Sequence, residues 1–107
     1  MDGFFTKELV SATHMFMGCK KLKRLDLREL KTSPGADIKN MFFGCSGLEY
    51  LDISGLKLND SSQTTNMFCF CDSLRKLVLP EDGYSRYILT ERLIQDLGYD
   101  FEEVIVK

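Results

Sequence analysis

The stretch that decides the fold is Asn40–Ser54, which reads Asn-Met-Phe-Phe-Gly-Cys-Ser-Gly-Leu-Glu-Tyr-Leu-Asp-Ile-Ser. Its first six residues are repeated with changes at His14 (His-Met-Phe-Met-Gly-Cys) and at Asn66 (Asn-Met-Phe-Cys-Phe-Cys). Asn40 lies as far along the chain from His14 as Asn66 lies from Asn40. Each of these blocks is followed by the same spacing of apolar residues, found in Leu22-Leu25-Leu27, Leu48-Leu51-Ile53 and Leu74-Leu77-Leu79. The chain is therefore built on an internal repeat, whose period is the interval from His14 to Asn40.

A repeat of this length with a Leu-x-x-Leu-x-Leu spacing is typical of leucine-rich repeats. The last two apolar residues alternate with polar ones, which predicts a short strand with one buried face. The Met-Phe-x-Gly-Cys block follows a Thr or Asn, which can cap a short helical turn. We therefore expect an α/β fold. It would be a short leucine-rich-repeat solenoid with a parallel β-sheet on its concave side and short helical turns behind the sheet. Residues 31–39 and 57–65 contain turn-forming residues and are expected as loops on the convex side.

The ends of the chain depart from the repeat. We expect a single domain over residues 1–107 with these parts: a partial repeat at 1–13, repeats at 14–39, 40–65 and 66–83, and an atypical C-terminal capping unit at 84–107. Terminal units of solenoids are usually atypical because they must close the core. The capping unit is predicted to hold an amphipathic helix from Thr90 to Leu97, with Thr90 as N-cap and Gly98 just beyond its end. A last strand is expected around Ile105.

Composition narrows the classes of function. The net charge of −2 gives no general affinity for nucleic acid or for anionic membranes. The first residues lack a secretory signal, and no stretch approaches the roughly 20 apolar residues of a membrane span. We expect a cytoplasmic protein if Met1 is the native start, and a cell-surface location if the chain is a fragment of a longer one. No membrane partner is expected.

The outward-facing strand residues are the candidate binding site. They form three lanes across the predicted sheet, which are Arg24-Tyr50-Lys76-Glu103, Asp26-Asp52-Val78-Ile105 and Arg28-Ser54-Pro80-Lys107. Tyrosine and arginine typically anchor protein interfaces. We therefore predict a protein-binding patch made of Arg24, Tyr50, Lys76, Arg28, Asp26, Asp52 and Val78. Nearby Lys20, Lys21 and Lys23 would steer an acidic partner towards it.

Cysteine and histidine favour structural roles. Cys19, Cys45 and Cys71 share one repeat position and are expected to stack as a ladder inside the core, with Cys69 as the more exposed thiol. The Cys69-Phe70-Cys71 pair matches no zinc spacing. His14 stands where the other repeats have Asn, so we expect it to cap a helical turn or to form a hydrogen bond. No metal, no cofactor and no catalytic residue is expected, and the chain is not predicted to be an enzyme.

The Asn-Met-Phe-x-Gly-Cys-x-x-Leu block followed by Leu-Asp-Ile/Leu-Ser resembles the BspA-like leucine-rich repeats of bacterial surface proteins. The resemblance covers about residues 4–80, with Phe5–Val10 similar to a loop of that family. It implies adhesion or protein binding without catalysis. Within this class, the chain could be a stand-alone binder or inhibitor of the phage or mobile-element type, or a fragment of a cell-surface adhesin. Alternatives are nucleic-acid binding through the basic cluster Lys20–Lys31 and self-association through the N-terminal edge.

Overall fold

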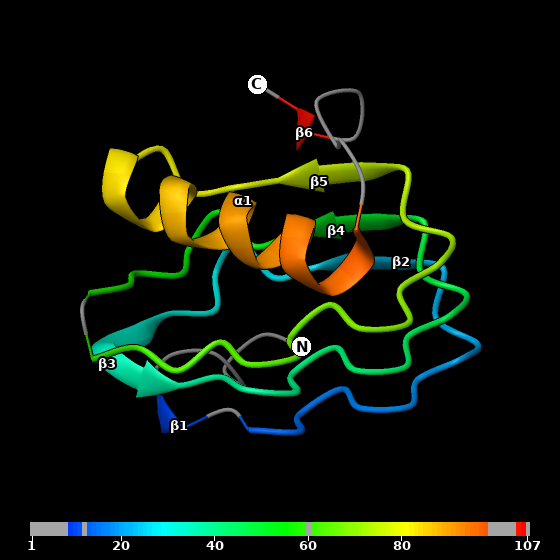
Figure 1. Cartoon of the computed structure of the whole chain (residues 1–107), viewed down its shortest axis with the longest axis horizontal. Helices are drawn as coiled ribbons and strands as arrows, with labels where there is room; N and C mark the ends of the chain where they lie inside the picture. The colour runs from blue at the N-terminus through cyan, green and yellow to red at the C-terminus, as the bar shows by residue number, and fades with distance from the viewer. Residues whose placement is uncertain (1–8, 12, 60, 99–104, 107) are drawn as a thin grey trace.

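Four parallel strands form the main sheet of the computed structural model, which describes residues 9–11, 13–59, 61–98 and 105–106. Their order in the sheet is β2-β4-β5-β6, and their bounds are β2 (Arg24–Asp26), β4 (Tyr50–Asp52), β5 (Lys76–Val78) and β6 (Ile105–Val106) (Figure 1). The described residues form a small mixed α/β domain with one helix, which packs against the repeats that supply the strands.

The register of β2, β4 and β5 follows the period of the sequence. Arg24 lies opposite Tyr50, and Tyr50 lies opposite Lys76, so that positions one period apart are neighbours in the sheet. This confirms the first two predicted lanes within these three strands, whereas the third lane lies beyond the ends of the strands. The register of β6 was predicted wrongly, because Val78 pairs with Val106 and not with Ile105. The cause is the insertion of a helix before β6, which makes the last unit longer than one period.

A second, two-stranded parallel sheet is formed by β1 (Leu9–Ser11) and β3 (Thr32–Asp37). The expectation of a loop over residues 31–39 is therefore wrong for the residues of β3. The central Ser-Pro-Gly residues of β3 favour turns, and the pairing of β1 with β3 accommodates them by a register shift between Leu9 and Ser11. Gly35 takes a φ of 84°, which glycine adopts without steric cost.

The repeated blocks at residues 14–19, 40–45 and 66–71, called turn blocks below, were predicted as helical turns and are not helical. His14, Asn40 and Asn66 have φ values of 63°, 58° and 55°, in the left-handed region. An N-cap residue has extended geometry instead, so these three residues do not cap helices. Asparagine and histidine are among the few non-glycine residues that adopt this conformation at low cost, and each starts a tight turn here.

Backbone hydrogen bonds tie each turn block to the next. The N–H of Phe16 donates to the carbonyl of Met41 at 2.9 Å, and the N–H of Phe42 donates to the carbonyl of Met67 at 3.1 Å. The Gly44 N–H continues this ladder to the Cys69 carbonyl at 2.8 Å. The turn blocks therefore stack in the same order as the strands, on the side of the core opposite to the main sheet (Figure 1).

The core fills the space between the main sheet and the turn blocks. Phe16, Phe42 and Phe68 stack in one column, with ring centroids 5.8 Å and 6.2 Å apart and nearly parallel planes. Phe42 and Phe68 are fully buried, as is Leu51 in the central strand. Equivalent residues of successive repeats thus pack against one another and bury a continuous apolar interior.

Helix α1 (Gly83–Leu97) packs against the segment of the chain that contains Leu58 and Phe68 (Figure 1). It begins at Gly83 and not at the predicted Thr90, because Asp82 is the N-cap and accepts a hydrogen bond from the Ser85 N–H at 3.0 Å. The predicted end is confirmed, since Gly98 takes the left-handed conformation that follows many helices. This helix is neither long nor apolar enough to cross a membrane, and no other helix occurs in the described ranges.

Two contacts show that α1 takes the place of a fourth turn block. The carboxylate of Asp96 accepts the Phe68 N–H at 2.9 Å, where the two earlier blocks use a backbone carbonyl of the following block. The hydroxyl of Ser85 accepts the Leu58 N–H at 2.9 Å. Side chains of the helix therefore satisfy backbone donors that would otherwise be left without partners at this end of the core.

Candidate protein-binding face

The exposed side of β2, β4 and β5, called the sheet face below, carries the first predicted lane. The guanidinium carbon of Arg24 lies 3.9 Å from the centroid of the Tyr50 ring, which is a cation–π contact. Lys76 is the next residue in the same lane. Arg24 and Lys76 are exposed and Tyr50 is half-buried. The structure thus brings these three predicted residues together on one surface.

Arg28 and Asp26 form a second element of the sheet face. The Arg28 Nε lies 3.3 Å from the Asp26 carboxylate, and the Arg28 N–H donates to the same side chain at 3.2 Å. The Arg28 side chain is 68% exposed and that of Asp26 is 38% exposed, and such surface ion pairs contribute little to stability. The pair therefore orients Arg28 on the sheet face without being needed for folding.

Asp52 and Val78 were predicted as partner-binding residues, and the structure gives them different surroundings. Asp52 is only 7% exposed, and its carboxylate accepts hydrogen bonds from the Ser54 hydroxyl at 2.7 Å and from the Ser54 N–H at 3.0 Å. Asp52 is therefore not exposed on the sheet face as expected, because its carboxylate holds the turn after the central strand. Val78 is half-buried and Pro80 is buried, which leaves the C-terminal side of this face less open than expected.

The remaining charges make the sheet face basic. Lys23 and Arg75, which directly precede β2 and β5, are both exposed, whereas Glu49 is half-buried. Among the described residues of this surface, Lys23, Arg24, Arg28, Arg75 and Lys76 outnumber the carboxylates of Asp26, Glu49 and Asp52. Two residues of the predicted lanes, Glu103 and Lys107, lie outside the described residues.

The cysteine ladder is confirmed in the second and third turn blocks. Cys45 and Cys71 are fully buried, and their thiols donate to the carbonyls of Phe16 and Phe42 at 3.0 Å and 3.2 Å. Burial raises the pKa of Cys45 to about 11 and that of Cys71 to about 12. A nucleophilic cysteine needs the thiolate form at neutral pH, so these two thiols are chemically quiet. Cys69 is less buried than Cys71, as predicted.

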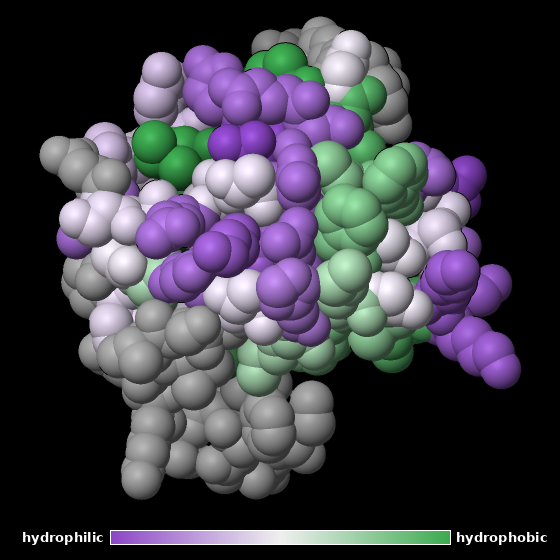
Figure 2. Space-filling view, turned by 60° about the horizontal axis from the view of Figure 1, so that its bottom comes forward, coloured by the Kyte–Doolittle hydropathy of each residue, from purple (hydrophilic) through white to green (hydrophobic). Residues whose placement is uncertain are grey.

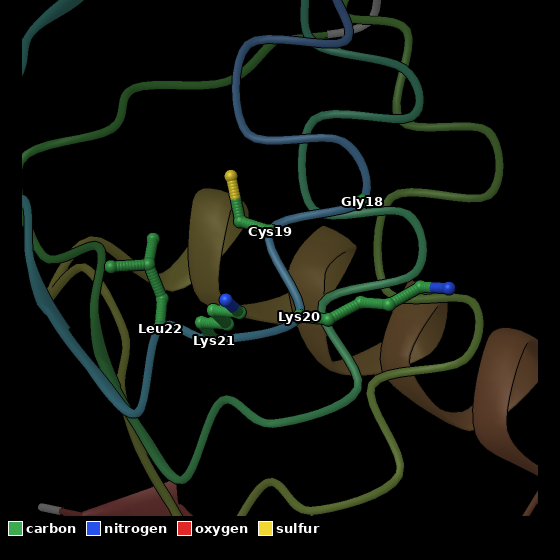
Figure 3. A pocket seen from close by; sticks show the side chains of 5 residues that line it. All are labelled: Gly18, Cys19, Lys20, Lys21 and Leu22. Carbon is green, nitrogen blue, oxygen red and sulfur yellow. The ribbon is translucent and has the colours of Figure 1, made fainter.

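Cys19 departs from the ladder, because it is only half-buried at the first turn block. It lines a cavity of about 540 Å³ together with Gly18, Lys20, Lys21 and Leu22 (Figure 3). Figure 3 shows the Cys19 and Lys20 side chains pointing away from each other. Lys20 and Lys21, two residues of the predicted basic cluster, therefore line this cavity.

His14 forms a hydrogen bond, as expected. Its Nε2 lies 3.2 Å from the side-chain amide nitrogen of Asn40. This contact joins the first residues of two turn blocks. Within the ranges that the structure describes, no group of three or more His, Cys, Asp or Glu side chains is placed to hold a metal ion.

Sequence reasoning did not single out Phe70. This residue is 60% exposed and has a φ of 66°. It stands where the two earlier turn blocks have Gly18 and Gly44, whose φ values are 75° and 77°. Aligning Met-Phe-Cys-Phe-Cys with Met-Phe-Phe-Gly-Cys would have shown a bulky residue in a glycine position.

No protein-family model, curated protein or solved structure matches the chain. The candidate site therefore depends on the geometry of the sheet face.

Proposed function

We propose that the chain is a leucine-rich-repeat solenoid that acts as a non-catalytic protein-binding module through its sheet face. The residues that contact the partner are Arg24, Tyr50, Lys76, Asp26 and Arg28. The observation that carries the proposal is the Arg24 guanidinium stacked 3.9 Å above the Tyr50 ring, with Lys76 next in the same lane. Arginine and tyrosine that are already held in place lose little entropy on binding, and these residue types dominate interface energies.

The solenoid part of the proposal is supported by the repeated contacts between units. The strands pair at an offset of one period, and the turn blocks donate backbone hydrogen bonds at the same offset. Each unit exposes an apolar side that only its neighbour can bury, which is the defining physics of stacked repeats.

The excess of cations on the sheet face indicates a partner with an acidic surface. Complementary charge raises the rate of association and suppresses partners of like charge. The absence of catalysis is proposed because Cys45 and Cys71 are buried and protonated, and because the ring of His14 is engaged by Asn40.

The test is a pull-down from lysate, read by mass spectrometry, that compares the wild type with the variant Arg24→Glu/Tyr50→Ala/Lys76→Glu. The matched control is Lys57→Glu/Gln63→Glu/Gln95→Glu, which makes the same change of net charge at exposed positions away from the sheet face. Circular dichroism establishes that each variant is folded.

A protein captured by the wild type and by the control, and lost from the sheet-face variant, supports the proposal. Equal loss from both variants would show that net charge alone governs capture. That result, with a steep dependence on salt, would favour nucleic-acid binding driven by overall charge over binding at the sheet face. Equal capture by all three proteins would exclude the sheet face as the site.

A further inference from the structure

The third turn block carries an unusual residue at a costly position. Phe70 has a φ of 66°, a conformation that glycine adopts freely and that a bulky side chain adopts only with strain. Its ring is 60% exposed, so the strain is not offset by burial in the core. Strained residues that persist in a fold are concentrated at functional positions. The exposed Phe70 ring therefore points to a contact made outside this chain.

Phe70 belongs to a continuous apolar surface. Its ring meets the Phe43 ring edge to face, with centroids 5.3 Å apart and planes at 78°. Phe43 is half-buried, and Met17 of the first turn block is 48% exposed. Figure 2 shows a column of apolar surface across the turn blocks, with hydrophilic side chains along one side and mostly side chains of intermediate hydropathy along the other. We call Met17, Phe43 and Phe70 the apolar ridge.

The two ends of the apolar ridge carry opposite charges. Lys20 follows the first turn block and Asp72 follows the third at the equivalent repeat position, and both are exposed. Lys21 adds a second exposed cation at the first end. None of the ion pairs formed among the described residues involves Lys20 or Asp72. The surface is therefore apolar along its length, positive at one end and negative at the other.

A surface with this charge order is complementary to a second copy of itself that runs in the opposite direction. We propose that the apolar ridge is a dimer interface at which a second copy of this chain binds in antiparallel orientation, about a two-fold axis close to Phe43. In that arrangement Lys20 of each copy faces Asp72 of the other, and each Phe70 ring lies against the apolar ridge of its partner. Two-fold interfaces use the same patch on both subunits, which is what the apolar ridge and its end charges provide.

This proposal does not depend on the proposed function, because the ridge lies across the turn blocks and the binding residues lie on the sheet face. It also differs from the predicted self-association through the N-terminal edge, since no strand pairing between copies is involved. The ridge is small, so the association is weak and reversible rather than permanent.

The first experiment is sedimentation velocity on the whole chain, from about 10 µM to about 1 mM, a range suited to small transient interfaces. The wild type shifts from monomer to dimer as its concentration rises. Phe70→Gly restores the residue of the other turn blocks, so it folds at least as stably while its dissociation constant rises by at least about tenfold. Tyr87→Ser is the matched control, because Tyr87 is 59% exposed on α1 and its loss leaves association unchanged. A wild type that stays monomeric throughout, or an equal effect of the two substitutions, overturns the proposal.

The second experiment tests the orientation of the two copies. Lys20→Glu brings two carboxylates together at each end of the interface, and Asp72→Lys brings two ammonium groups together, so each variant alone associates about tenfold more weakly at low salt. An equimolar mixture of the two variants pairs opposite charges again and regains wild-type association as a heterodimer. A mixture that associates no better than the single variants excludes the antiparallel arrangement.

Discussion

Replacing Gly55 with alanine should destabilise the domain, although its φ lies outside the region that only glycine tolerates. Gly55 follows the central strand and packs against the backbone of the preceding unit. An alanine Cβ would lie 2.5 Å from the Arg28 carbonyl oxygen and 2.6 Å from the Leu30 carbonyl oxygen. Real Cβ atoms essentially never approach closer than 3.0 Å, so the first two units must move apart at this point to make room for the methyl group.

The size of the effect follows from three terms. Overpacking in a well-packed region costs about 1–3 kcal/mol. The nearby hydrogen bond from the Leu27 N–H to the Asp52 carbonyl, 2.8 Å long, is stretched by the same displacement, and its loss would cost about 0.5–1.5 kcal/mol. Alanine also lowers the entropy of the unfolded chain, which offsets about 0.4–1 kcal/mol. The net loss is about 0.5–4 kcal/mol, and each kcal/mol lowers Tm by about 4–8 °C in a domain of this size.

Gly83→Ala is the matched control for this prediction. Gly83 is the first residue of α1, and an alanine Cβ there would meet no atom within 4 Å. The same substitution should therefore stabilise the protein slightly, by up to about 1 kcal/mol, because alanine favours the helix and the unfolded-state term is retained. Urea unfolding followed by far-ultraviolet circular dichroism measures both variants. A Gly55→Ala protein that unfolds at the wild-type urea concentration, with an unchanged m value, would refute the close packing of successive units at Gly55.

Three further predictions concern the core and its edges. Leu51→Ala in the central strand should cost about 2–5 kcal/mol in chemical denaturation, since the side chain is fully buried, and a loss near zero would contradict the register. Cys71, with a pKa raised to about 12 by burial, should react with a thiol reagent at pH 8 only as the protein unfolds. Burial also raises the pKa of Cys69, but this thiol is less buried, so it should react slowly with the native protein, and equal native rates for the two thiols would contradict this. Burial tends to raise the pKa of Asp37, but hydrogen bonds led by the Lys39 N–H outweigh it and the pKa is lowered. The stabilisation by this carboxylate is present above the unfolded pKa of about 3.9 and is lost as the pH falls through the lower folded value. On acidification from pH 5 the wild type should lose more unfolding free energy than Asp37→Asn, and parallel pH profiles would argue against it.

The register of β2, β4 and β5 could be predicted because their units repeat the same apolar spacing. Leu25, Leu51 and Leu77 must all point to the core, and a parallel sheet then places them side by side. The conformation of the turn blocks could not be predicted with the same ease. Asparagine favours both a helix N-cap and the left-handed conformation, and only the stacking of the blocks selects the second.

Tertiary contacts explain the other differences from the sequence-based expectations. Residues 32–37 show turn chemistry locally, and their strand exists because β1 offers it a partner. The first turn of α1 buries Ser85 rather than a leucine, so the apolar spacing starts only at Leu89 and conceals the true beginning of the helix. On the candidate site, the lane of Arg24 was predictable from strand alternation. The burial of Asp52 was not, because it arises from hydrogen bonds with Ser54 that no periodic pattern contains.

The two proposed surfaces can act together because they lie on opposite sides of the core. Pairing through Met17, Phe43 and Phe70 would cover the turn blocks and leave both sheet faces exposed, pointing away from each other. Each copy would then present Arg24 and Tyr50 to a separate partner, or to two sites on one repetitive partner. Binding at the second site becomes intramolecular in that case, so a weak dimer and a weak single-site affinity combine into a much stronger overall attachment. Phe70→Gly separates these contributions. It should retain the affinity of a single sheet face and remove the gain in affinity that comes from binding through the two sheet faces of a dimer. The same glycine should also relieve backbone strain, so a loss of attachment by a protein of equal or higher stability would locate the effect in the interface and not in the fold.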